Sequence, residues 1–300
     1  GKGGKVMFIK RLPEFEHHVP ASLPEALGLL SRYGEKAEVY AGGTDLLVAM
    51  KKREKTPKHL IHLNKIREMT GIHPDGKKGV RIGALTTLGE LERSTLVQGK
   101  YTILWDAVTM MASPQVKSLG TLGGNLCSAV PSADTAPPLI ALGASVKMAG
   151  PNGEREVLLE NFFRGPKESV LQKNELMKEV FIPQPGDVAS GKYLKLMRRE
   201  AMDLALVGVA ACLTMDASRK ICKGVRIALG AVAPTPIRVP QAEEVLINRE
   251  IDEVRAAEAG KAASVVCRPI GDIRSSLAYR CAMVEVLTKR AILEAYGRIR

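Results

Sequence analysis

The sequence contains no hydrophobic run long enough to cross a membrane. Its longest apolar stretch, Leu204 to Leu213, covers about half of the ~18–20 residues that a membrane-spanning helix needs. The N-terminal letters GKGGKVMF also lack the apolar region of a secretory signal, which is about 7–15 residues long. Because neither a span nor a signal is evident, we expect a cytoplasmic protein rather than a membrane or secreted one.

Cysteine is scarce and histidine forms no metal-binding motif. No Cys-x-x-Cys pair occurs, whereas an iron–sulfur cluster ordinarily needs four clustered thiolates. No His-Glu-x-x-His motif occurs, and His59 and His62 have a spacing that would place them on opposite faces of a strand. We therefore predict no metal site. Because no Gly-x-Ser-x-Gly motif is present, nucleophilic hydrolysis has no support and we assign no catalytic side chain. The cysteines are Cys127, Cys212, Cys222, Cys267 and Cys281.

Aromatic residues make up only 4% of the sequence, whereas its formal net charge is +12. The densest basic run, KKREKTPK at positions 51–58, has no aromatic residue on which a nucleic-acid base could stack. The charge therefore favours a solvated basic face or an acidic protein partner over a nucleic-acid site. Charged residues at 25% and hydrophobic residues at 45% are ordinary globular usage, and 300 residues suffice for two or three compact units.

Helical and strand-like patterns alternate along the chain. In SLPEALGLLSRYG, Leu23, Ala26 and Leu30 recur at helical spacing after Ser22, which predicts a short capped helix. The following AEVYAGGTDLL predicts a strand, a glycine turn and a second helix. We expect a domain boundary at QPGDVASG, residues 184–191, because this stretch is rich in turn residues. Beyond it, the pattern predicts a small sheet followed by helices.

Two glycine turns are the features with clear chemical meaning. They are Ala41 to Asp45, which lies between a strand and a helix, and Thr121 to Asn125. Such turns let backbone N–H groups converge on a phosphate without obstruction by a Cβ atom. A pyrophosphate suits two of them, although each alone is also typical of a structural turn. Neither matches the Gly-x-Gly-x-x-Gly fingerprint or the phosphate loop that ends in Gly-Lys-Ser/Thr, which disfavours ordinary nicotinamide binding and nucleotide hydrolysis.

Together with their surroundings, these turns resemble the FAD-binding medium subunits of the molybdenum hydroxylases, the family of carbon monoxide dehydrogenase, 4-hydroxybenzoyl-CoA reductase and xanthine dehydrogenase. The resemblance extends over nearly the whole chain. The segments that carry it are PEFEHHVPASLPEAL, AGGTDLL, IGALTTLGEL, SPQVKSLGTLGGNLCSAVPSADTAPPLIALGA, KYLKLMRRE, IALGAVAPTPIR and SSLAYRCAMVEVLTKRA.

The resemblance implies an α+β fold and noncovalent FAD. It implies a two-subdomain FAD-binding domain over residues 1–184, with subdomains of about 1–60 and 61–184 and the cofactor between them. Residues 185–300 would form a C-terminal domain with a small antiparallel sheet and a helical bundle.

The resemblance also implies which residues bind the cofactor. It places the FAD pyrophosphate on the backbone of both glycine turns, Asp134 at the ribose hydroxyls and Lys195 near the flavin. It places the backbone of Leu176 and Met177 beneath the cofactor. From the residues alone, Asp134 is also typical of a helix start and Lys195 of the protein surface. The implied binding residues are Ala41, Gly42, Gly43, Thr44, Asp45, Thr121, Gly123, Gly124, Asn125, Asp134, Leu176, Met177 and Lys195.

A further segment of this family runs past the isoalloxazine ring of the flavin. In this sequence it corresponds to Arg198 and Arg199, with Asp203 and Leu204 after them. A guanidinium group there would favour a reduced, anionic flavin, whereas an ordinary Arg–Asp surface pair is the alternative interpretation. Tyr193 is a further candidate for shielding the ring, and its direction cannot be read from the sequence.

The resemblance predicts an oxidoreductase subunit, the FAD-binding electron-transfer component of a heterotrimeric molybdenum hydroxylase. In this family a molybdopterin-binding large subunit oxidises the substrate, and a small subunit relays electrons through 2Fe-2S clusters. The flavin then passes the electrons to an external acceptor. The chain lacks the cysteine-bearing insertion of the 4-hydroxybenzoyl-CoA reductase relative, which disfavours that activity. Two alternatives stay open: a basic binding module without flavin, and a self-sufficient oxidase whose FAD is covalently attached to a His or Cys.

Overall fold

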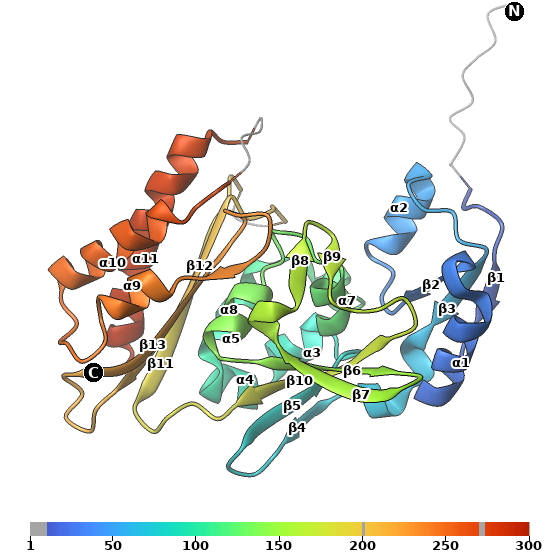
Figure 1. Ribbon diagram of the computed structural model, residues 1–300, viewed down its shortest axis with the longest axis horizontal. Helices are drawn as coiled ribbons and strands as arrows, with labels where there is room; N and C mark the ends of the chain where they lie inside the picture. Colours follow the sequence, from blue (N-terminus) through green and yellow to red (C-terminus); the bar gives the residue numbers. More distant parts are fainter. Residues whose placement is uncertain (1–10, 200–201, 270–273, 300) are drawn as a thin grey trace, which may run out of the picture.

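The computed structural model of the chain describes residues 11–199, 202–269 and 274–299 (Figure 1). Three main sheets follow one another along the long axis of the molecule, from the blue N-terminal end to the orange C-terminal end. They contain three, five and four strands, and a separate two-stranded sheet pairs β8 (Phe163–Gly165) with β9 (Glu168–Ser169). This mixed α+β architecture confirms the fold class that the sequence predicts.

The first sheet is small and parallel. Its strand order is β1 (Glu16–His18), β3 (His59–His62) and β2 (Ala37–Tyr40). Helix α1 (Leu23–Tyr33) packs against it, and α2 (Leu46–Lys52) follows the first glycine turn. The Ser22 hydroxyl accepts a hydrogen bond from the N–H of Glu25, which confirms the helix cap expected from the sequence.

The second sheet is antiparallel and has one buried face. Its strand order is β4 (Ile72–Pro74), β5 (Gly79–Gly83), β10 (Leu176–Pro183), β6 (Ser145–Gly150) and β7 (Gly153–Leu158). Alternate side chains such as Val80, Ile82, Val180 and Ile182 belong to the main hydrophobic core. Their neighbours, such as Arg81, point to the other face, as the two-residue period of a strand requires.

Short helices accompany this sheet and carry the second glycine turn. They are α3 (Leu88–Arg93), α4 (Thr95–Lys100), α5 (Thr102–Met110), α6 (Pro114–Lys117), α7 (Leu122–Cys127) and α8 (Ala136–Ala141). Single 3-10 turns lie at Gly34–Lys36, Leu63–Lys65, Arg67–Met69 and Leu159–Asn161.

The third sheet is antiparallel and is covered on both faces. Its strand order is β11 (Ala189–Leu196), β12 (Val207–Met215), β13 (Cys222–Gly230) and β14 (Ile237–Arg238). Helices α9 (Pro240–Glu244), α10 (Glu253–Val265) and α11 (Leu277–Gly297) follow it, as the sequence predicts. Side chains such as Val209 and Leu213 join a second hydrophobic core with α10 and α11. Alternate side chains such as Ala210 join the main core, because α5 and α8 pack against the opposite face (Figure 1).

An ion pair joins the two cores across this contact. The Arg298 guanidinium donates to both carboxylate oxygens of Asp106 at 2.9 Å, and Asp106 also accepts from the N–H of Tyr193 at 3.2 Å. Asp106 lies on α5, whereas Arg298 directly follows α11. The C-terminal helix is therefore tied to the middle of the molecule by a charge-assisted, two-point contact.

Within the described residues, no helix has both the length and the apolar character that crossing a bilayer requires. The expected domain boundary at residues 184–191 lies between β10 and the first residues of β11. The expected subdomain boundary near residue 60 falls inside β3, which ends at His62.

Candidate functional site

The first glycine turn joins β2 to α2 and presents consecutive backbone donors. Gly43 has a φ of 69°, a left-handed conformation that favours glycine. Its carbonyl oxygen accepts a hydrogen bond from the N–H of Leu47 at 3.1 Å. By contrast, the N–H groups of residues 42–45 have no hydrogen-bond acceptor anywhere in the described part of the chain. These adjacent N–H groups are therefore available to an anion.

The second glycine turn begins α7, and its backbone donors are used inside the protein. The N–H of Gly123 donates to the carbonyl oxygen of Ala84 at 2.8 Å, and that of Gly124 donates to the Thr121 hydroxyl at 3.0 Å. The N–H groups at 122 and 125 also donate to backbone carbonyls. A Cβ atom on Gly123 would lie 2.7 Å from the Cβ and the carbonyl oxygen of Ala84. Close packing on Ala84 therefore requires Gly123.

The fold places the two turns side by side. A Cβ atom on Gly42 would lie 2.0 Å from the carbonyl oxygen of Leu119 and 2.9 Å from the N of Gly120. A Cβ atom on Gly120 would in turn lie 3.8 Å from the hydroxyl oxygen of Thr44. Gly42 thus allows the first turn to touch the backbone that leads into the second. One site can therefore include residues of both turns.

Asp134 and Lys195 form a buried ion pair. Lys195 Nζ lies 2.9 Å from Asp134 Oδ2, and the Tyr193 hydroxyl donates to Asp134 Oδ1 at 2.9 Å. Burial raises the pKa of Asp134, although Lys195 and Tyr193 act in the opposite direction. Burial beside this carboxylate also raises the pKa of Tyr193 well above its ordinary value. Because its side chain is only 1% exposed, Lys195 is not a surface lysine.

Asn125 connects this ion pair to the second turn. Its Oδ1 accepts a hydrogen bond from the Thr135 hydroxyl at 2.6 Å, and Thr135 directly follows Asp134. The amide nitrogen of Asn125 is then the part of the side chain left to donate outward. Sequence reasoning missed Thr135 and the contact of Tyr193 with Asp134. The two-residue alternation of β11, which puts Tyr193 and Lys195 on one face, is the signal from which that contact follows.

Leu176 and Met177 are core residues of β10. These two residues are 2% and 4% exposed. The carbonyl oxygen of the next residue, Lys178, accepts a hydrogen bond from the N–H of Ala84 at 2.9 Å. Ala84 in turn accepts the hydrogen bond of Gly123, so β10 supports the second turn through Ala84.

The backbone N–H groups of Arg198, Arg199 and Leu204 are held by Asp203. Its carboxylate accepts hydrogen bonds from the N–H groups of Arg198 at 2.9 Å, Arg199 at 3.3 Å and Leu204 at 3.1 Å. Desolvation raises the pKa of Asp203, but these backbone donors outweigh it and leave the pKa below its ordinary value. The side chains of Arg198, Arg199 and Leu204 are exposed. Asp203 therefore orders the backbone and leaves these side chains at the surface.

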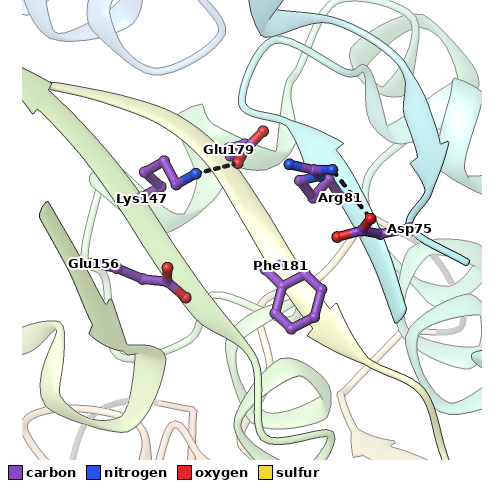
Figure 2. A pocket seen from close by; sticks show the side chains of 6 residues that line it. All are labelled: Asp75, Arg81, Lys147, Glu156, Glu179 and Phe181. Carbon is purple, nitrogen blue, oxygen red and sulfur yellow. Dashed lines mark ion pairs between the residues drawn. The ribbon is translucent and has the colours of Figure 1, made fainter. Parts of the chain in front are cut away.

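A pocket on the five-stranded sheet has a different chemistry. Figure 2 shows the acidic and basic side chains that line it interleaved across neighbouring strands. Arg81 lies 3.2 Å from Asp75, and Lys147 lies 3.1 Å from Glu179. Because lining carboxylates neutralise both cations, the pocket does not select an anion. No residue of the two glycine turns lines it. The lining residues are Asp75, Arg81, Lys147, Glu156, Glu179 and Phe181.

Family models match both parts of the chain. The model described as "FAD binding domain in molybdopterin dehydrogenase" matches residues 13–185, and that described as "CO dehydrogenase flavoprotein C-terminal domain" matches residues 192–295. The chain is 36% identical over 286 residues to the carbon monoxide dehydrogenase medium chain of Hydrogenophaga pseudoflava, covering 95% of this chain and 98% of that one. It is 30% identical over 280 residues to the xanthine dehydrogenase FAD-binding subunit of Escherichia coli O157:H7, covering 93% and 95%.

Solved structures agree with these matches. A chain of carbon monoxide dehydrogenase from Hydrogenophaga pseudoflava superimposes with a TM-score of 0.92 at 36% identity, covering 96% of this chain and 99% of that one. A chain of quinoline 2-oxidoreductase from Pseudomonas putida 86 gives a TM-score of 0.90 at 30% identity, covering 96% and 99%. The fold and the paired turns therefore define an FAD-binding oxidoreductase subunit. The chain belongs to the FAD-binding medium subunits of the molybdenum hydroxylases, which confirms the resemblance seen in the sequence.

Proposed function

We propose that this chain passes electrons from the 2Fe-2S clusters of a small partner subunit, via noncovalent FAD, to an external acceptor. In this proposal a molybdopterin-binding large subunit oxidises the substrate, and the three subunits form a heterotrimer. The observation that carries the proposal is the first glycine turn. Its N–H groups at residues 42–45 have no acceptor among the described residues and lie beside the second turn, in a chain that matches the family along its length.

The first turn fits a pyrophosphate, and the second supports it in another way. We assign Ala41 to Asp45 to the phosphate groups, because consecutive backbone donors stabilise negative charge. In the second turn, Thr121 and the amide nitrogen of Asn125 supply polar atoms. Gly123 and Gly124 allow the close packing and the helix cap that hold these two side chains in place.

We assign the buried ion pair of Asp134 and Lys195 to the part of the site that binds the ribose. One carboxylate oxygen of Asp134 accepts a hydrogen bond from Tyr193 and the other accepts one from Lys195, and each retains a lone pair that can accept from a ribose hydroxyl. Lys195 neutralises Asp134 and fixes its direction, so Lys195 acts mainly through that carboxylate. We assign the backbone of Leu176 and Met177 to the cofactor, because their side chains are buried in the core, whereas the next residue, Lys178, supports Ala84 and the second turn.

When bound, FAD supplies a redox centre that takes up and releases electrons singly or in pairs. The residues of this chain bind the cofactor, orient it and limit access to it, and we assign no catalytic side chain. Burial raises the pKa of Cys127, which ends α7, to about 12, and this disfavours that thiol as a covalent attachment point. A thiol with such a pKa stays protonated and is a poor nucleophile toward a flavin ring.

We further propose the domain organisation that the family matches favour. Residues 1–184 form the FAD-binding domain and residues 185–300 the C-terminal domain, with the first domain divided near the end of β3. A cytoplasmic location and the absence of nucleic-acid binding remain part of this proposal.

Acid precipitation of the purified chain tests the cofactor assignment. We expect the yellow colour to pass into the supernatant, and chromatography to identify FAD rather than FMN. The apoprotein should then regain one equivalent of FAD on titration. Flavin that stays with the precipitate would support the covalent oxidase alternative. A colourless chain that takes up no FAD would support the basic binding module.

The electron route is tested by adding subunits one at a time. The isolated, FAD-loaded chain should show no flavin bleaching with aldehydes or N-heterocycles, because no substrate-oxidising group is assigned to it. Bleaching should begin only when both the molybdenum and the iron–sulfur subunits are present. If the isolated chain is bleached by such a substrate, electrons enter without the relay and the proposed route is wrong.

A further inference from the structure

A carboxylate and two imidazoles meet on one face of the small parallel sheet. Glu16 and His18 are two residues apart on β1 and therefore point to the same face. The parallel register places Glu16 beside His59 on β3, so the three side chains come together across neighbouring strands. None of them belongs to the glycine turns or to the buried ion pair of Asp134.

The ligand atoms of these residues already have the spacing of a metal site. His18 Nε2 lies 3.2 Å from His59 Nδ1, and Glu16 Oε2 lies 3.3 Å from His59 Nδ1 and 3.8 Å from His18 Nε2. Two ligand atoms at about 2.0–2.1 Å from a tetrahedral zinc ion are about 3.3 Å apart. A zinc ion can therefore enter this cluster with only small side-chain adjustments.

Packing holds the two imidazoles and leaves the carboxylate accessible. The ring of Tyr33, from α1, stacks on His59 with centroids 3.7 Å apart and on His18 with centroids 5.0 Å apart. The side chains of His18 and His59 are 19% and 14% exposed, whereas that of Glu16 is 70% exposed. No lysine or arginine of the described residues forms an ion pair with Glu16, so no fixed cation competes with a metal there.

We propose that Glu16, His18 and His59 bind one zinc ion. Two imidazole nitrogens and one carboxylate oxygen are a donor set typical of zinc, and the exposed side of the cluster leaves the fourth position to water. The ion links β1 to β3 beneath Tyr33 and so stabilises the edge of the first sheet. This proposal is independent of FAD, because the cluster shares no residue with the assigned cofactor site.

The site departs from the sequence-based expectation of no metal. That expectation considered His59 together with His62, and β3 does hold them in different surroundings. His62 stacks on Tyr40 with centroids 4.3 Å apart, whereas His59 meets His18. The partners of His59 come from β1, and only the pairing of the two strands reveals them.

Calorimetric titration of zinc into the full-length, tag-free, FAD-loaded chain tests the proposal after treatment with a chelator. We expect one equivalent to bind and the unfolding temperature to rise, because a ligand specific for the folded state stabilises it. Cobalt(II), which replaces zinc in such sites, should give the strong visible absorption of tetrahedral coordination. His59→Gln and His18→Gln should each weaken zinc binding by at least about 100-fold, because losing a ligand costs more than losing one of its supporting contacts.

Two further variants distinguish the loss of a zinc ligand from a loss of folding and from the loss of an unrelated histidine. Glu16→Gln changes a largely exposed side chain, so it should weaken zinc binding while leaving the zinc-free unfolding temperature unchanged. His73→Gln is the matched control, because His73 lies on β4 and bonds to the carbonyl oxygen of Thr70 outside the cluster. Its zinc affinity should equal that of the unmodified chain. The proposal is overturned if the unmodified chain binds no stoichiometric zinc, if the cluster variants bind it equally well, or if His73→Gln abolishes binding.

Discussion

Three glycines of the two turns serve different physical purposes. Gly42 allows contact with the backbone of Leu119, Gly43 adopts a left-handed φ of 69°, and Gly123 packs on Ala84. Of these, Gly43 is the position where backbone conformation itself favours glycine. A glycine pair in a sequence therefore does not say which of its residues serves a ligand and which serves packing.

At Gly42, alanine should weaken FAD binding. Its Cβ atom would lie 2.0 Å from the carbonyl oxygen of Leu119, so the two turns must move apart. We expect FAD affinity to fall at least ~10-fold, about 1.4 kcal/mol, in a fluorescence titration of the apoprotein. Gly28→Ala is the matched control, since a Cβ atom there, on α1, meets nothing within 4 Å. It should keep FAD affinity and raise stability by about 0.5–1 kcal/mol. Wild-type affinity in Gly42→Ala would remove this contact from the site.

At Gly123, alanine should destabilise the fold itself. Its Cβ atom would lie 2.7 Å from two atoms of Ala84, in backbone that also carries the hydrogen bond from Gly123 to Ala84. We expect urea unfolding of the apoprotein to show a loss of about 1–3 kcal/mol, the usual cost of overpacking. An unchanged apoprotein with weakened FAD binding would show that this glycine serves the ligand directly.

At the scale of single elements, strand β11 carries the polar contacts between the C-terminal domain and the candidate site. Tyr193 and Lys195 point from one face of the strand to Asp134, whereas Lys192 points to the other face and pairs with Glu294 at 3.2 Å. The same strand thus holds one buried and one more exposed lysine pair. Because both pairs lie on one strand, the contribution of a buried lysine pair to stability can be compared with that of a more exposed one.

Replacing Lys195 by Met should be strongly destabilising and dependent on pH. The change leaves a buried carboxylate without its cation, which costs about 3–5 kcal/mol. Burial already raises the pKa of Asp134, and loss of Lys195 removes the main opposing influence. A raised pKa in the folded state means that stability falls as pH rises through that pKa. Urea unfolding should therefore show a larger loss at pH 8 than at pH 5.

Lys192→Met provides the control for this prediction. Its partner Glu294 is 48% exposed, so loss of the pair should cost less than about 1 kcal/mol at either pH. A second variant, Lys195→Met with Asp134→Asn, should recover part of the stability and lose the pH dependence. Equal losses for the two lysine variants would show that burial of the Asp134 pair contributes nothing measurable.

At the scale of the whole molecule, the third sheet connects the main hydrophobic core to the C-terminal core. One of its faces belongs to the C-terminal core with α10 and α11, and the other packs on α5 and α8. The bidentate contact of Arg298 with Asp106 crosses this junction. The end of the last helix is therefore tied to α5, which lies in the first half of the chain.

Replacing Arg298 by Met should loosen this junction. Asp106 is 8% exposed and would lose its cation, so we expect a loss of about 3 kcal/mol in urea unfolding. Hydrogen exchange should increase in both α5 and α11, because each loses its partner. Arg255→Met is the control, since its pair with Asp252 lies on the surface within one helix turn and is worth less than about 1 kcal/mol. A loss no larger than that of the control would contradict a role for Arg298 at the junction.

Features that depend on neighbouring residues were determined by the sequence. The Ser22 cap, the strand–turn–helix order around Ala41 to Asp45 and the sheet-then-helices order of the last third all appear in the structure. Caps, turns and hydrophobic periods act over a few residues, so they are legible in the chain itself. The family likeness rests on the same local motifs and is confirmed.

Contacts between distant segments were decided only by the tertiary structure. The approach of Gly42 to Leu119, the burial of Lys195 against Asp134 and the meeting of Glu16, His18 and His59 each join residues far apart in sequence. No local pattern encodes such a distance, because strand register and packing in the core set it. For this reason the sequence pointed to both glycine turns, while the structure separated the turn with open donors from the turn whose donors are already used.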